Sequence, residues 1–318
     1  MEYLDAASIR RHLDWPTVIG AIERALTANI EAPVRVNHRI DVPGMPSGSL
    51  LLMPAWQVGD KIGVKIVTVM PGKESRSVSA VYVLFDGVDG HPLAMMEGEE
   101  LTARRTAGAS ALAARYLARP DAKHLVMIGS GRQSAGLVAA HASVRPIERV
   151  TIWSRTAGQA DHAAKTHRAS GLNALATDDL ERAVRDADIV SCATLSTLPI
   201  VHGEWLKPGV HLDLVGAFKA DMRETDDAAM ARADCIVVDQ RDAALAEGGD
   251  VVQALRSGAI GSDRISGDLR DLVTGRIGGR TSPDAITVFK SVGFALEDLA
   301  AATAVWDAQR RRHPAVAH

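Results

Sequence analysis

Cysteine is scarce in this chain, with two residues among 318, Cys192 and Cys235. Each lies inside an apolar run and neither belongs to a Cys-x-x-Cys pair, so we expect buried thiols rather than a disulfide or a metal site. The eleven histidines show no His-Glu-x-x-His or mixed Cys/His ligand spacing. We therefore expect no bound metal.

Strong charge and long apolar segments are also missing. The net charge of −3 and the pI near 6.4 give no electrostatic basis for binding nucleic acid or an anionic membrane. No apolar run reaches the roughly 18 residues that a membrane helix needs, and Met1–Asp5 does not resemble a secretory signal. We expect a cytoplasmic protein whose partners include neither nucleic acid nor membrane.

What the chain does contain is ordinary globular composition, 47% hydrophobic and 24% charged, at a length that allows two domains. Its most informative stretch is an apolar run that ends in Gly-x-Gly-x-x-Ser and continues into a helix-compatible segment. This pattern is typical of a dinucleotide-binding turn, in which the first glycine permits the bend and the second lets the backbone approach a pyrophosphate. The predicted turn comprises Gly129, Ser130, Gly131, Arg132 and Gln133.

The end of the following strand-like run, residues 149–154, indicates which dinucleotide binds. An NAD site usually has Asp or Glu about 20 residues after the glycines, to bind the ribose 2′-hydroxyl. This chain has Ser154, Arg155 and Thr156 there. A guanidinium flanked by hydroxyls suits a 2′-phosphate, so NADPH is the expected cofactor, with NADH possible. The alternative is that Arg155 is only a solvated loop residue.

The order of patterns along the chain predicts an α/β fold with a doubly wound parallel sheet. A helical period covers residues 8–27, short β-rich runs follow at 49–53, 62–69 and 78–85, and residues 100–117 are helical. Strands and helices then alternate from residue 124 to about 240, and a last strand at 286–293 leads into a helix at 295–312. The later strands are expected at 187–193, 211–216 and 235–239. The two chain ends are expected to complete one domain around a separate middle.

Several ordered blocks together resemble the ornithine cyclodeaminase/μ-crystallin family over nearly the whole chain. They are Leu52-Met53-Pro54-Ala55, Gly63-Val64-Lys65-Ile66-Val67, Leu101-Thr102-Ala103-Arg104-Arg105-Thr106-Ala107, the glycine turn with Gln133, and Thr287-Val288-Phe289-Lys290-Ser291-Val292-Gly293. The resemblance implies a homodimer with a dimerisation domain (1–115 and 288–318), a Rossmann NAD(P)-binding domain (116–287) and an active site between them. Members move a hydride between nicotinamide and the α-carbon of an amino or imino acid.

By this similarity, Arg35, Lys65 and Arg105 bind the substrate carboxylate. Arginine suits that task because it binds carboxylates in a bidentate fork. Lys65 interrupts an apolar β run, so from the residues alone it is either an outward-facing lysine or a functional one. It is also the first candidate to deliver a proton to the substrate nitrogen, with ordered water as the alternative. Arg39 and Arg104 remain possible substitutes for Arg35 and Arg105.

The resemblance also extends the predicted cofactor site beyond the glycine turn and the Arg155 segment. Glu247 is an ordinary polar loop residue when taken by itself, and the family match places it beside the nicotinamide. The added residues are Thr106, Thr194, Leu195, Val215, Glu247 and Ser291.

One departure from the family pattern concerns the reaction type. Cyclodeaminases of the family have a catalytic aspartate after the Gly-x motif at which this chain reads Gly216-Ala217-Phe218. Phe218 cannot carry a proton, and Asp221 is three residues further on. The pattern with Met-Arg-Glu-Thr-Asp after it is similar to the Δ1-pyrroline-2-carboxylate reductases. We therefore predict NAD(P)H-dependent reduction of this cyclic imino acid to L-proline, and of Δ1-piperideine-2-carboxylate to L-pipecolate.

Two other functions stay open at this point. One is a different enzyme of the same family, an ornithine cyclodeaminase or an alanine dehydrogenase. The other is a protein that binds NADP(H) without catalysis, against which the retention of Lys65, Arg105 and the glycine turn argues.

Overall fold

A computed structural model describes residues 1–70 and 78–312, and it divides into two compact units. Unit 1 combines Met1–Arg105 with the C-terminal part from Phe294, and unit 2 is Thr106–Gly293. The sequence placed the two boundaries at 115/116 and 287/288. The helix α3 (Gly98–Leu117) contributes residues to both units, so its sequence pattern alone could not mark the division.

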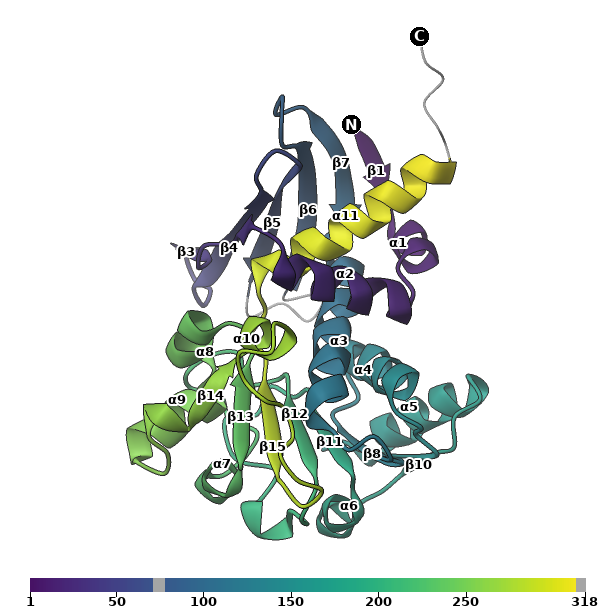
Figure 1. The fold of residues 1–318 in the computed structure, drawn as a ribbon, viewed down its shortest axis with the longest axis vertical. Coiled ribbons are helices and arrows are strands. Elements are labelled where there is room, and N and C mark those ends of the chain that lie inside the picture. Colours follow the sequence, from purple (N-terminus) through teal and green to yellow (C-terminus); the bar gives the residue numbers. More distant parts are fainter. Residues whose placement is uncertain (71–77, 313–318) are drawn as a thin grey trace. The chain divides into compact units, whose positions relative to one another are not determined.

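Unit 1 is an antiparallel sheet with helices on one face (Figure 1). The strand order is β1-β7-β6-β5-β4-β2, with β3 also paired to β4, and only the β1–β7 pair is parallel. The strands are β1 (Glu2–Leu4), β2 (Ile30–Glu31), β3 (Val36–Ile40), β4 (Gly48–Gln57), β5 (Lys61–Val69), β6 (Val78–Asp86) and β7 (Pro92–Glu97). The predicted runs at 49–53, 62–69 and 78–85 all lie within strands.

The helices of unit 1 are α1 (Ala6–His12), α2 (Trp15–Thr27) and α11 (Ala295–Arg312). The period at 8–27 predicted one helix, which is wrong, because the chain turns at Leu13 and Asp14. The Asp14 carboxylate caps α2 by accepting from the Thr17 amide (2.9 Å), and Pro16 occupies the first turn of the new helix. The predicted helix at 295–312 is confirmed and contacts α2, β4, β5 and β6.

Unit 2 contains an eight-stranded sheet in the order β10-β9-β8-β11-β12-β15-β13-β14, and all its pairs are parallel. The strands are β8 (His124–Ile128), β9 (Arg149–Trp153), β10 (Ala174–Ala176), β11 (Ile189–Cys192), β12 (His211–Leu214), β13 (Cys235–Val238), β14 (Ile265–Asp268) and β15 (Thr287–Lys290). The helices are α4 (Arg132–Val144), α5 (Ala157–Ala169), α6 (Leu180–Asp186), α7 (Asp227–Arg232), α8 (Arg241–Glu247), α9 (Gly249–Ser257) and α10 (Leu269–Val273), with short 3₁₀ turns η1 (Gly203–Trp205) and η2 (Ser262–Arg264).

The strand order of unit 2 confirms the predicted doubly wound sheet. From β8 the chain proceeds outward through β9 to β10, and it then returns to β11 on the other side of β8. Right-handed crossovers in opposite directions place helices on both faces of the sheet. The reversal between β8 and β11 is the topological switch point, beside which ligands bind in open α/β sheets. Both cysteines are buried free thiols, as predicted.

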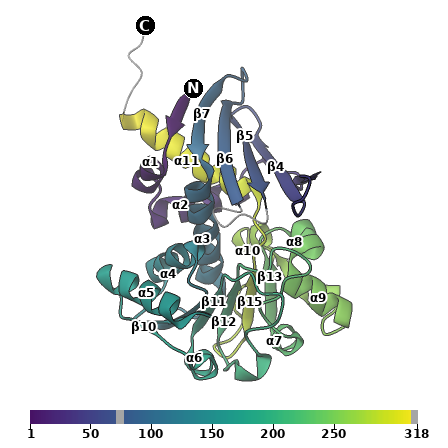
Figure 2. The same cartoon turned by 180° about the vertical axis from the view of Figure 1, so that it is seen from behind.

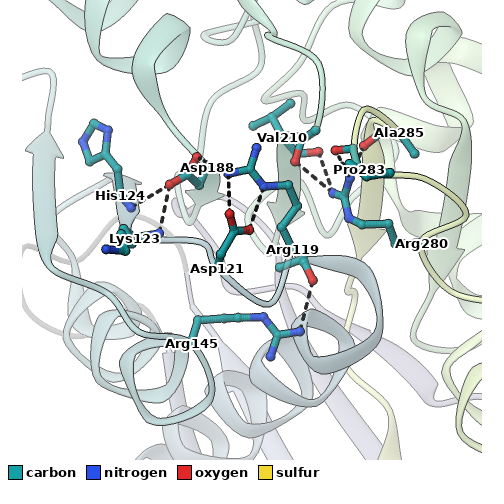
Figure 3. Close-up of polar contacts among 12 residues, drawn as sticks. Arg119, Asp121, Lys123, His124, Arg145, Asp188, Val210, Arg280, Pro283 and Ala285 are labelled. Atoms are coloured by element: carbon teal, nitrogen blue, oxygen red, sulfur yellow. Dashed lines mark hydrogen bonds and ion pairs between the residues drawn. The ribbon is translucent and has the colours of Figure 1, made fainter.

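Arginines anchor the C-terminal end of α3 to the rest of unit 2. Arg145 donates to the carbonyls of Ala114 (2.7 Å) and Ala118 (3.1 Å) at this end of the helix. Arg280 donates to the carbonyls of Leu117, Gly209 and Ala285 and so ties α3 to the loops before β12 and β15. Figure 3 shows this region, with Arg119 directed at Asp121 and Asp188. These guanidinium groups bind carbonyl and carboxylate oxygens of the protein itself, which gives them a structural role.

Candidate functional site

The predicted cofactor residues of unit 2 gather at one edge of its sheet. Gly129 follows β8, Thr194 lies just after β11, Val215 follows β12 and Ser291 follows β15. These four strands are consecutive neighbours, and the register pairs Ile128 with Cys192, Cys192 with Leu214, and Leu214 with Lys290. The segments therefore emerge side by side at the carboxyl ends of the strands, beside the switch point.

The glycine turn has the backbone geometry that its sequence predicted. Gly129 has φ +110°, and a Cβ there would lie 2.7 Å from the Ala193 carbonyl oxygen, so only glycine fits. Gly131 is the N-cap of α4, whose first turn receives no hydrogen bond from a capping side chain. A Cβ on Gly131 would meet no atom of the described residues within 4 Å. The backbone is therefore accessible at a helix N-terminus, which suits a pyrophosphate.

A buried acceptor lies at the same turn. The Oε1 atom of Gln133 has no hydrogen-bond partner among the described residues, although it is buried. Buried polar atoms are usually satisfied, so Gln133 is suited to a ligand that supplies a donor. The open Gly131 backbone and this acceptor together fit a bound dinucleotide.

The segment after β9 lies against the glycine turn. The Ser130 hydroxyl donates to the Ser154 hydroxyl (3.0 Å), and Arg155 and Thr156 are exposed beside it. The segment contains no carboxylate, so its side chains offer no charge repulsion to a 2′-phosphate.

The remaining predicted cofactor residues occupy different environments. Thr106 is buried in α3, Leu195 is 75% exposed, and Glu247 is the half-buried last residue of α8. The Ser291 hydroxyl donates to Asp239 (3.0 Å), which also accepts from the amides of Val292 and Gly293. Ser291 is thereby fixed in place at the end of β15.

The predicted substrate cations of unit 1 are joined by one carboxylate. Asp298 of α11 lies 2.8 Å from the Lys65 ammonium and accepts from the Arg105 Nε at 2.9 Å. Arg105 also donates to Glu297 at 2.8 Å. Lys65 is 2% exposed, Arg105 is 4% exposed and both acids are fully buried. Lys65 therefore faces inward, which decides between the two orientations that the sequence left open.

Burial changes the acid–base behaviour of this cluster. The pKa of Lys65 is lowered to about 8, chiefly because burial disfavours the ammonium, and the positive charge of Arg105 lowers it further. The negative charge of Asp298 and its hydrogen bond with Lys65 raise the Lys65 pKa and offset part of this lowering. Tyr82 pairs with Lys65 across the strands, its hydroxyl has no hydrogen-bond partner among the described residues, and burial raises its pKa. A lysine with this pKa exchanges protons readily near neutral pH.

The structure also bears on the alternative arginines. Arg35 is close enough for its charge to lower the Lys65 pKa, whereas Arg39 is paired with Asp41 at 2.8 Å on the surface. Arg104 is paired with Glu100 at 3.2 Å, donates to the Leu13 carbonyl and lies over the Trp15 ring. These contacts favour Arg35 and Arg105 as the substrate-binding pair.

Sequence reasoning missed Glu297 and Asp298. A Glu-Asp pair in the first turn of a helix is usually explained by the helix dipole and solvent, which hid its role. The signal in the sequence that could have revealed them is their position between apolar residues. Both acids stand between Leu296 and Leu299 in a helical turn that is buried on all sides, and buried acids there require buried cations.

Phe218 lies in the loop after β12 and is half-buried, whereas Asp221 is exposed. The described residues contain no group of three or more His, Cys, Asp or Glu side chains that could hold a metal ion. Within the same residues, no helix is long and apolar enough to span a membrane.

Comparison with known proteins shows similarity along the whole chain. The chain is 39% identical to a Δ1-pyrroline-2-carboxylate reductase of Paracoccus denitrificans, with 94% of each protein covered. It is 35% identical to the mouse ketimine reductase mu-crystallin, with 96% of each covered. The solved Δ1-pyrroline-2-carboxylate reductase of Thermococcus litoralis, in complex with NADH and L-proline, superposes with a TM-score of 0.91 at 31% identity, covering 99% of this chain and 98% of that one.

The sequence profile of the ornithine cyclodeaminase/mu-crystallin family matches residues 2–313. This range includes the cation cluster of unit 1 and the glycine turn of unit 2. The chain belongs to the ornithine cyclodeaminase/mu-crystallin family.

Proposed function

We propose that this protein is an NAD(P)H-dependent reductase of cyclic ketimine carboxylates. It converts Δ1-pyrroline-2-carboxylate to L-proline and also accepts Δ1-piperideine-2-carboxylate, giving L-pipecolate. The observation that carries the proposal is the buried cluster in which Asp298 holds Lys65 and Arg105 (2.8 and 2.9 Å). The similarity to reductases named for this imine supports it.

The cluster accounts for the selection of a carboxylate. Its formal charges balance, because Lys65 and Arg105 face Asp298 and Glu297. Arg35 lies close enough for its charge to lower the Lys65 pKa, so a third cation stands near the pair and can contact a substrate carboxylate.

The cofactor supplies the hydride that reduces the C=N carbon. The chain's own residues bind and orient it. We assign the pyrophosphate to the turn from Gly129 to Gln133 and the 2′-phosphate of NADPH to Ser154, Arg155 and Thr156. The nicotinamide half is assigned to Thr106, Thr194, Leu195, Val215, Glu247 and Ser291. The open backbone at Gly131 and the unsatisfied Gln133 oxygen support this assignment.

Reduction also requires a proton on the substrate nitrogen. Lys65 is assigned that role because its pKa of about 8 leaves a proton on the amine at neutral pH, and that proton is easily released. Phe218 cannot carry a proton, and Asp221 is exposed. Cyclodeamination needs an additional proton carrier to expel ammonia, whereas imine reduction begins after that step.

We further propose a homodimer that forms through the sheet of unit 1. The helices α1, α2 and α11 lie on one face, and Figure 2 shows the other face of the strands. The register places apolar side chains on that other face in adjacent rows, and they are partly buried except Ile62, which is exposed. They are Leu52, Pro54, Trp56, Ile62, Val64, Ile66, Val81, Val83, Phe85 and Met95. Apolar patches of this kind mark interfaces. We also propose a cytoplasmic location, which the two free thiols support.

The reaction type is tested with a panel of substrates supplied to the purified protein with NADPH and NADH, or with the oxidised cofactors for ornithine. We expect cofactor oxidation with both cyclic imines, formation of L-proline and L-pipecolate, and no ammonia from ornithine. Ammonia release from ornithine identifies a cyclodeaminase, and turnover of pyruvate with ammonium identifies an alanine dehydrogenase. Dinucleotide binding without turnover of any substrate identifies a binding protein. Each of these outcomes contradicts the proposal.

Lys65→Met tests the proton donor. Because the Lys65 pKa is lowered to about 8, its proton is present below that pH and lost as pH rises through it. We expect wild-type kcat to fall as pH rises above about 8. In the variant we expect kcat to be about 10²–10⁴-fold lower and to show no such fall with pH. Lys61→Met, on the same strand and paired with Asp60, should behave like wild type. Near-normal kcat of Lys65→Met at saturating imine rejects the assignment.

Arg155→Ala tests the cofactor preference. Loss of a charge-assisted contact to the 2′-phosphate should weaken NADPH binding by roughly 1.5–3 kcal/mol and leave NADH binding almost unchanged. The measurement is KM for each cofactor. Lys165→Ala, at an exposed position of α5, is the matched control. Equal losses for the two cofactors refute the 2′-phosphate site.

Val83→Glu tests the dimer, because it places a charge at the centre of the proposed interface. Wild type is expected to sediment at twice the 33.8 kDa chain mass, and the variant at one chain mass. The control is Val88→Glu, at a turn position that is 81% exposed. A monomeric wild type, or a variant that remains dimeric, excludes this interface.

A further inference from the structure

One buried carboxylate connects two loops of the proposed cofactor site. Glu224 accepts from the Thr194 amide (2.6 Å) and hydroxyl (2.8 Å) through Oε1, and from the Gly216 amide (2.8 Å) through Oε2. Thr194 follows β11 and Gly216 follows β12, whereas Glu224 belongs to the segment before α7. Its side chain is fully buried. The two loops are therefore held together by a group that belongs to neither.

The fit around this carboxylate is tight. A Cβ on Gly216 would lie 2.2 Å from the Glu224 Oε1 and 2.4 Å from the Thr194 carbonyl oxygen. Glycine at 216 is what lets the carboxylate reach both loops. A shorter or displaced acid could not accept from both amides at once.

A second buried acid fixes Glu224 itself. Asp250 at the start of α9 accepts through Oδ1 from the amides of Glu224 (2.8 Å) and Thr225 (2.9 Å), and from the Thr225 hydroxyl. Its Oδ2 faces the Lys290 ammonium at 3.2 Å. Lys290 is the last residue of β15, next to Ser291. The network thus reaches three of the strand ends that carry predicted cofactor residues.

We propose that Glu224 is a positioning residue of the dinucleotide site, whose ionised carboxylate holds the Thr194 loop and the Val215–Gly216 loop in the arrangement that the nicotinamide half of NAD(P)H requires. This inference rests on the proposed function, because Thr194 and Val215 are assigned to the cofactor there. The carboxylate is suited to the task because both of its oxygens accept and neither donates.

The same contacts make cofactor affinity sensitive to pH. The pKa of Glu224 is raised to about 7, chiefly by burial; Lys290 of β15 lowers it and Asp250 of α9 raises it. The thiol of Cys192 on β11 also lies near it, and the pKa of that thiol is raised by burial and by the Glu224 charge. Protonation converts one oxygen into a donor that faces a backbone N–H. Affinity for NADH should therefore fall as pH falls through about 7.

Glu224→Gln tests this positioning role, because the glutamine side chain has an NH2 group, which donates, in place of one of the two accepting carboxylate oxygens. Calorimetric titration with NADH, without any imine, measures Kd on both sides of about pH 7. We expect Kd to rise about tenfold or more in the variant, because one buried amide of the two loops loses its carboxylate acceptor (the Gly216 amide would keep only the Cys192 carbonyl, at 3.2 Å), and to vary little with pH. Glu204→Gln, at an exposed position of η1, should match wild type. An unchanged Kd with retained pH dependence overturns the inference.

Hydrogen exchange of the wild-type protein supplies a second test that does not depend on the variant folding. After correction for intrinsic rates, the amides of Thr194 and Gly216 should lose protection together as pH falls through about 7. Constant protection of both amides contradicts the proposed role. If the wild-type protein binds neither NADH nor NADPH, the proposed function and this inference are both wrong. If the wild type binds NADH and Glu224→Gln binds it with the same Kd and pH dependence, only the inference is wrong.

Discussion

The site of unit 1 depends on the contact of one buried carboxylate, Asp298, with two cations. Lys65 on β5 and Arg105 on α3 are nearly inaccessible to water, and each lowers the stability of the charged form of the other. Asp298 compensates both, at 2.8 and 2.9 Å, and comes from the C-terminal helix. Removing one partner of a buried pair typically costs about 3–5 kcal/mol. The C-terminal helix is therefore part of the site as well as part of the core.

Buried carboxylates also hold separate segments together in unit 2. Buried acids from other segments of the chain hold the strand-end loops through backbone amides and hydroxyls, as Glu224 does for Thr194 and Gly216, and as Asp239 after β13 does for Ser291 and its neighbours after β15. A parallel sheet brings the loops to one edge, but it does not fix their conformation. Charge-assisted hydrogen bonds from these amides to carboxylates are stronger than neutral ones and supply that precision.

The sequence predicted what depends on local pattern. The glycine turn, the alternation of strands and helices and the closing helix are readable because each follows from residues adjacent in the chain. The break at Asp14 was missed because a helical period continues across it. Asp298 was missed because its partner Lys65 lies 233 residues away in the sequence. Glu224 was missed because its partner Thr194 lies 30 residues away and follows another strand. Long-range pairing of polar groups leaves no periodic trace in a sequence.

The most direct test of the account compares the binding of L-proline and L-prolinamide to the NAD(P)-loaded protein. The two ligands share the ring and differ in whether a carboxylate is present. Because the three cations Lys65, Arg105 and Arg35 gather at this site, and a carboxylate forms charge-assisted hydrogen bonds with such groups whereas an amide forms only neutral-acceptor ones, we predict that L-proline binds at least about 100-fold more tightly than the amide. Equal affinity for the two ligands would show that the buried cluster does not recognise a carboxylate, and the assignment of the site would be wrong.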